Sequence, residues 1–178
     1  MTSIVRLDSV AAVYGDAHIH SLQSDKAVQN GQVGVAGNLL AGEREVRNFD
    51  LPKDLATAKA VLVSHDEINY DSSRRSQNNL NRFEIEAGTP FRAYDLVEND
   101  IISVSFDGVD ALGDKPVVGN VVTMQTDSHK LAEAADGGNA RFVGRIERLD
   151  KIGVATVTGA PGMIGGVTDL AVIRVISN

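Results

Sequence analysis

The chain has 178 residues, with 17 Lys and Arg against 24 Asp and Glu, and a formal net charge of −7 at pH 7. This acidic balance argues against a surface for nucleic acid or an anionic membrane, because both attract clustered Lys and Arg. The absence of cysteine excludes disulfides, thiolate nucleophiles and sulfur-rich zinc sites. No apolar run approaches the roughly 18 to 20 residues of a membrane helix, and no signal-peptide pattern is present, so we expect a soluble protein that is not exported by that route.

The composition favours a β-dominated domain. The 17 glycines, the low aromatic content of 4% and the many Val and Ile residues are typical of short strands joined by tight turns. Residues 1–26 show no sustained period, although Ile4-Val5 and residues 11–14 each fit a short strand. We therefore expect an extended N-terminal arm over residues 1–26 that orders against a neighbour, followed by a β-rich domain over residues 27–178.

Turn and strand signals fill the first part of this domain. Asn30-Gly31 tolerates the positive φ angles of a two-residue turn and predicts a hairpin between residues 27–28 and 33–35. Residues 44–49 read as a charged edge strand that Pro52 ends. The short apolar run over residues 60–63 predicts a buried strand.

Further strands follow a long polar loop over residues 69–79. Phe83, Ile85 and Ala87 alternate with glutamates, which favours a strand, although residues 80–87 also fit one face of a helix. Residues 91–96 and 101–106 predict two more strands, and in the second Ile102 and Val104 alternate with serines, as expected for one buried face.

The last third of the sequence predicts one short helix and several strands. Good helix formers over residues 130–135 follow a capping Asp127 or Ser128 and stop at Gly137. Residues 117–125, 140–149, 153–157 and 170–176 have strand patterns, and Gly144 on the apolar face of one of them permits sharp coiling or close backbone approach. We therefore expect a mainly β fold, a small barrel or sandwich with one short helix.

Few residues suggest chemistry. Asp16, His18 and His20 are the densest set of possible metal ligands, but a structural site needs four, so polar positions in an arm explain them better. The sequence His65-Asp66-Glu67 resembles part of an acid/base cluster, and solvated residues at a strand end are the favoured explanation. The glycines over residues 159–166 lack the Lys-Ser/Thr ending of a phosphate loop, and no Gly-x-Ser-x-Gly elbow occurs. We expect no enzyme, cofactor or metal.

Other residues suggest contact with a large partner. In the polar loop, Arg74 and Arg75 suit carboxylates on an acidic surface and Tyr70 is an amphipathic anchor, while a simply solvated loop explains the same residues equally well. Met163 and Ile164 are apolar residues in a Gly-rich turn, which suggests a contact there.

The order of these motifs resembles the head-decoration (capsid cement) proteins of tailed bacteriophages. The resemblance spans residues 27–178, and its elements are short, so its strength lies in their order. The motifs that carry it are Asn30-Gly31, Gly42-Glu43-Arg44-Glu45-Val46, Val61-Leu62-Val63, Tyr70-Asp71, Phe83, Glu86-Ala87-Gly88, Arg92-Ala93-Tyr94-Asp95-Leu96, Asn99-Asp100-Ile101-Ile102-Ser103-Val104, Val118-Gly119-Asn120-Val121-Val122, Phe142-Val143-Gly144-Arg145-Ile146 and Ala171-Val172-Ile173-Arg174-Val175.

The resemblance implies a non-enzymatic structural protein of the virion. Such a protein, formed in the host cytoplasm, would sit on the outer face of the assembled capsid as a homo-oligomer and bridge major capsid subunits. We expect contacts with capsid or sister subunits from Tyr14, His18, His20, Tyr70, Arg74, Arg75, Met163 and Ile164. Two alternatives stay open: another virion component, such as a tail or head-completion protein, and a small carbohydrate-binding module, against which the few aromatic residues count.

Overall fold

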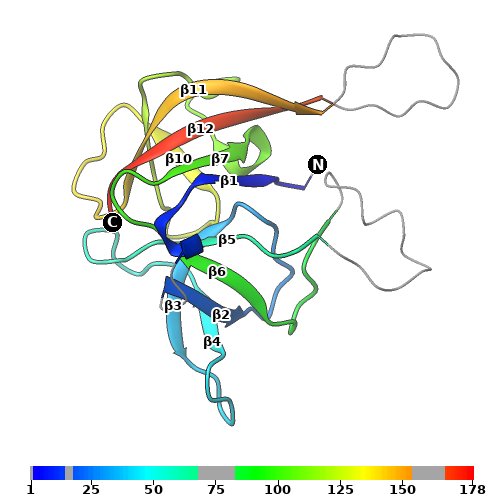
Figure 1. Ribbon diagram of the computed structural model, residues 1–178. Helices are drawn as coiled ribbons and strands as arrows, with labels where there is room; N and C mark the ends of the chain where they lie inside the picture. Colours follow the sequence, from blue (N-terminus) through cyan, green and yellow to red (C-terminus); the bar gives the residue numbers. More distant parts are fainter. Residues whose placement is uncertain (1, 15–17, 68–82, 154–166) are drawn as a thin grey trace, which may run out of the picture.

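The computed structural model describes residues 2–14, 18–67, 83–153 and 167–178, and its chain is mainly β (Figure 1). A closed five-stranded barrel lies below a seven-stranded sheet in this view. The barrel has the strand order β2-β4-β3-β5-β6, with β2 (Ile19–Gln23), β3 (Val33–Leu39), β4 (Arg47–Asp50), β5 (Val61–Val63) and β6 (Phe91–Asp95). These features confirm the predicted β-rich class, and of the two expected architectures, barrel or sandwich, the chain contains a closed barrel.

The sheet has the strand order β1-β7-β12-β11-β9-β10-β8. Its strands are β1 (Val5–Ser9), β7 (Ile101–Ser105), β8 (Val109–Asp110), β9 (Val121–Thr123), β10 (Leu131–Ala134), β11 (Val143–Gly153) and β12 (Val167–Ser177). Two 3-10 segments, η1 (Ala11–Tyr14) and η5 (Phe106–Gly108), lie within the described part of the chain. No helix among the described residues has the length and apolarity needed to cross a membrane.

Two apolar cores explain why β5 is a wholly apolar strand. Val61 and Val63 face the barrel interior, where Phe49 and Phe91 meet edge to face with centroids 5.4 Å apart. Leu62 points the other way, into a second core between the barrel and the sheet that also contains Ile102. Because adjacent side chains of a strand point to opposite faces, a strand between two cores needs apolar residues at every position.

The N-terminal residues, expected as an arm, form strands with the rest of this chain instead. β1 pairs with β7, with Val5 opposite Val104, and β2 pairs with both β6 and β4 of the barrel. Ser103 and Ser105 are buried rather than exposed as predicted, and their hydroxyls contact residues of the N-terminal segment. The Ile4 amide donates to Ser105 Oγ at 2.9 Å, and Ser103 Oγ donates to an Asp8 carboxylate oxygen.

The predicted helix over residues 130–135 is wrong. Residues 131–134 form β10, which pairs antiparallel with β9 and parallel with β8. Leu131 and Glu133 are buried while Ala132 and Ala134 are less so, which is the alternation of a strand. Sheet pairing and burial of alternate residues therefore outweigh the helix preference of this segment.

Two other predictions are correct only in part. A turn forms at Asn30-Gly31, with φ of 85° at Gly31 and a hydrogen bond from the Gln32 amide to the Gln29 carbonyl. Its flanks do not form a hairpin, because Val28 bridges to Ile85 and β3 pairs with β4 and β5. The charged segment over residues 44–49 does contain a strand, β4, but this strand lies between β2 and β3 and is not an edge.

Gly144 has the close-approach role that its sequence context predicts. A Cβ atom on this residue would lie 2.6 Å from Ile173 Cγ2 and 3.0 Å from Val122 Cγ2. The β11–β12 register also shifts between Val143 and Gly144. The missing side chain therefore lets β11 pack tightly against its two neighbours at an irregular point of the sheet.

Candidate functional site

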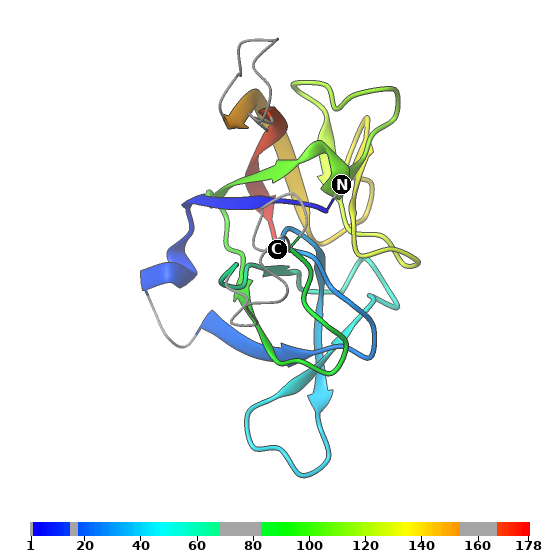
Figure 2. The same ribbon diagram turned by 90° about the vertical axis from the view of Figure 1, so that its right-hand side faces the viewer.

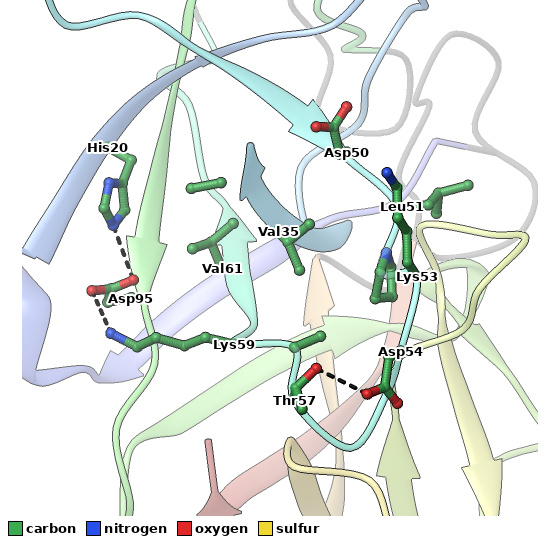
Figure 3. Close-up of a pocket in the computed structure, with 13 residues that line it drawn as sticks. His20, Val35, Asp50, Leu51, Lys53, Asp54, Thr57, Lys59, Val61 and Asp95 are labelled. Atoms are coloured by element: carbon green, nitrogen blue, oxygen red, sulfur yellow. Dashed lines mark hydrogen bonds and ion pairs between the residues drawn. The ribbon is translucent and has the colours of Figure 1, made fainter. Parts of the chain in front are cut away.

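A cavity of about 470 Å³ opens beside the barrel, next to the segment that follows β4 (Figure 3). Val35, Ala36 and Val61 from the barrel strands supply apolar lining. Residues 51–54 form one side, where the Asp54 carboxylate accepts the Ala56 amide and the Thr57 hydroxyl, both at 3.0 Å. Such side-chain bonds hold a turn in shape, so this wall of the cavity is fixed.

Asp95 is the buried charge of the opposite wall. Its side chain is 8% exposed and accepts hydrogen bonds from Lys59 Nζ at 2.8 Å and from His20 Nε2 at 3.0 Å. Burial by itself would raise the pKa of Asp95, but the hydrogen bonds from Lys59 and His20 outweigh it and lower that pKa below its ordinary value. The carboxylate therefore stays ionised and is held by the Lys59 ammonium and a ring N–H of His20, which suits structural fixation better than proton abstraction.

His18 lies just before β2 and His20 lies within that strand. His18 Nδ1 lies 3.7 Å from Asp95 Oδ2, so both imidazoles approach one carboxylate. Asp16 lies outside the described residues. Within the residues that the structure does describe, no group of three or more histidine or acidic side chains is arranged to hold a metal ion.

Tyr14 and Val13, which we call the η1 surface, are an exposed apolar pair on a fixed segment. Tyr14 is 91% exposed and Val13 48% exposed, whereas Ala12 beside them is buried. The buried Asp100 carboxylate accepts the Ala11 amide at 2.9 Å and the Val97 amide at 2.8 Å, and so ties η1 to the turn between β6 and β7. The predicted contact residue Tyr14 is therefore both solvent-accessible and held in place.

A second exposed apolar group, the 112–118 surface, consists of Leu112, Val117 and Val118. These side chains are 65%, 54% and 53% exposed. Their loop is fixed by the Glu133 carboxylate, a 4% exposed residue of β10. Glu133 accepts the Leu112 amide at 3.0 Å, and the Val117 amide and Asn120 Nδ2 at 2.8 Å each.

The two surfaces lie on different sides of the molecule. In Figure 2 the η1 segment is at the left edge and residues 111–120 are at the upper right. Sequence reasoning singled out Tyr14 but missed the 112–118 surface. The sequence signal for this surface was the pair Val117-Val118 between Pro116 and Gly119. Two valines in such a turn indicate exposed apolar side chains more strongly than valines within a strand do.

The sequence His65-Asp66-Glu67 does not form an acid/base cluster. Among the described residues, no hydrogen bond or ion pair joins the side chains of His65 and Glu67. The Asn30 side chain instead bonds the His65 backbone at 2.8 and 2.9 Å and donates to Glu67 Oε1 at 3.2 Å. Burial lowers the pKa of His65 and raises that of Glu67. Asp66 is exposed and lies 3.9 Å from Arg92.

The remaining predicted contact residues lie outside the described part of the chain. They are Tyr70, Arg74, Arg75, Met163 and Ile164. No protein-family model matches this chain, and no match was found among the curated proteins or the solved structures.

Proposed function

We propose that this protein is a capsid decoration protein of a tailed bacteriophage. It binds the outer face of the assembled head as a small homo-oligomer and stabilises contacts between neighbouring major capsid subunits. The order of sequence motifs supports this proposal, and so does a β-rich fold that displays apolar side chains on fixed loops.

The observation that carries the proposal is the pairing of each exposed apolar surface with a buried carboxylate. Asp100 fixes the η1 surface and Glu133 fixes the 112–118 surface, in both cases by accepting backbone amides. Exposed apolar groups on a rigid support bind a partner with little loss of loop entropy. Two such surfaces on different sides suit a protein that bridges two neighbours.

Because many copies bind one capsid, each contact with a capsid subunit can be weak and the lattice is still stabilised. Fully burying one Val or Leu side chain contributes about 1.5–3 kcal/mol, before the cost of association is subtracted. A protein that binds only the assembled lattice stabilises that lattice by mass action, and several linked contacts raise the overall affinity.

Co-sedimentation with capsids of the encoding phage tests the proposal. The wild-type protein is mixed with expanded capsids and, for comparison, with unexpanded procapsids. We expect saturable binding to expanded capsids at a fixed ratio to the major capsid protein. Binding to neither particle contradicts the proposal, and binding only to tails assigns the protein to another part of the virion.

Surface variants identify which residues make the contact. Tyr14→Ser and the double variant Val117→Ser/Val118→Ser each remove an apolar contact without touching either buried carboxylate. Leu149→Ser is the matched control, because Leu149 is an exposed apolar residue, 40% accessible, in the β11–β12 hairpin. We expect both test variants to lower capsid occupancy and the control to retain it.

A further inference from the structure

A groove of about 660 Å³ on the outside of the barrel gathers three arginines. It runs between the outer faces of β2 and β6 and the loop that joins β3 to β4, the lowest part of the molecule in Figure 1. Arg44, Arg47 and Arg92 line it together with one carboxylate, Glu45. This concentration of positive charge is unexpected in a chain whose formal net charge is −7.

The guanidinium groups of the groove are largely unused by the fold. Arg44 makes no hydrogen bond or ion pair with the described residues, and Arg47 donates a single bond, to the Gly37 carbonyl at 3.3 Å. Arg92 has Asp66 at 3.9 Å, but both side chains are exposed, by 60% and 72%, so this pair contributes little. Most of these N–H donors therefore have no acceptor among the described residues.

The geometry points to carboxylates as the ligand chemistry. A guanidinium presents a planar fork of donors that matches a carboxylate in a bidentate arrangement. Ile19 and Leu39 add apolar lining, which suits the methylene stems of Asp and Glu side chains. The three cations come from β6, β4 and the β3–β4 loop, so a ligand that engages all of them must carry more than one acidic group along its length.

We propose that this groove binds an acidic peptide segment of a partner protein. A nucleic acid is a poorer fit, because the described lining of the groove has no Phe, Tyr or Trp side chain on which a base could stack. The proposal does not depend on the capsid assignment. It names the groove and its ligand chemistry for any partner with an acidic segment.

Fluorescence anisotropy with a labelled hexaglutamate peptide tests this inference at low ionic strength. The full chain is compared with the double variant Arg44→Ala/Arg92→Ala and with Arg148→Ala. Arg148 is the matched control, because its side chain is 66% exposed and its acidic neighbour Asp150 lies 3.4 Å away on the same strand, β11. We expect the double variant to bind about tenfold more weakly and the control to bind as the wild type does.

Three results would overturn the inference. They are an absence of peptide binding by the wild type, an equal loss in Arg148→Ala, and tighter binding of an oligothymidylate than of hexaglutamate. Thermal unfolding of each variant confirms that it is folded. Because no capsid is present in this assay, its failure and a failure of capsid binding are separate outcomes.

Discussion

Replacing Glu133 with Gln should loosen the 112–118 surface and destabilise the whole domain. The carboxylate is 4% exposed; Oε1 accepts the Val117 amide and Asn120 Nδ2, and Oε2 accepts the Leu112 amide. A Gln oxygen can replace Oε1, but its NH₂ group then faces the Leu112 amide, donor against donor. The substitution keeps the shape and removes one acceptor together with the charge.

The expected loss follows from these three bonds. Two hydrogen bonds change from charged to neutral, which costs about 1 kcal/mol each, and leaving the part-buried Leu112 amide without an acceptor costs about 1–3 kcal/mol. Burying a neutral amide is less costly than burying a carboxylate, which offsets part of this loss. We therefore expect a net decrease of about 2–4 kcal/mol in the free energy of unfolding.

Urea unfolding measures this change, provided that the slope m is the same in both proteins. Glu98→Gln is the control, because Glu98 is exposed in the turn before β7. Amide hydrogen exchange should accelerate at Leu112 and Val117 in Glu133→Gln. A loss below about 1 kcal/mol, or no larger than that of the control, would refute the assigned role of Glu133.

Three further predictions concern other parts of the fold. Gly144→Ala should destabilise the sheet by about 1–3 kcal/mol in thermal unfolding, because its Cβ would lie 2.6 Å from Ile173 Cγ2, whereas Gly113→Ala, whose Cβ meets nothing within 4 Å, should not. Asp95→Asn should cost about 1–2 kcal/mol at pH 7, since it leaves Lys59 and His20 without their carboxylate. The stability difference between Asp95→Asn and the wild type should shrink as the pH falls below 3.8. The folded-state pKa of Asp95 is lowered, so the wild type loses the stabilisation from the ionised carboxylate when Asp95 is protonated. A difference that does not change with pH contradicts the assigned role of the Asp95 carboxylate. Burial lowers the pKa of His129, whose ring stacks on the Phe49 ring with centroids 4.3 Å apart, so its NMR titration midpoint should lie below 6.5. The neutral ring therefore stabilises the fold above pH 6.5 and progressively less below it. A midpoint above 6.5 contradicts this packing.

Patterns that depend on one strand and its own burial could be predicted from the sequence. The apolar run of β5 and Gly144 on a crowded face are examples. In each case the local side-chain order records whether one or both faces are covered. The β-rich class and the barrel follow from many such short signals.

Features that depend on distant partners could not be predicted. Residues 131–134 consist of good helix formers, and only pairing with β8 and β9 makes them a strand. The structural role of Asp95 depends on its hydrogen bonds with Lys59 and His20, which lie 36 and 75 positions away in the sequence. The pairing of the N-terminal strands within this chain could not be predicted, because each is five residues long and pairs with a strand much later in the chain.

The central claim is that this protein binds the outer face of an assembled phage head through its fixed apolar surfaces. A cryo-EM reconstruction of expanded capsids saturated with the purified protein tests this most directly. The proposal predicts ordered density for this fold on the outer face, bridging neighbouring subunits, with the η1 surface or the 112–118 surface buried in the contact. Density that leaves Tyr14, Leu112, Val117 and Val118 all facing solvent, or capsids without added density at saturating protein, would contradict it.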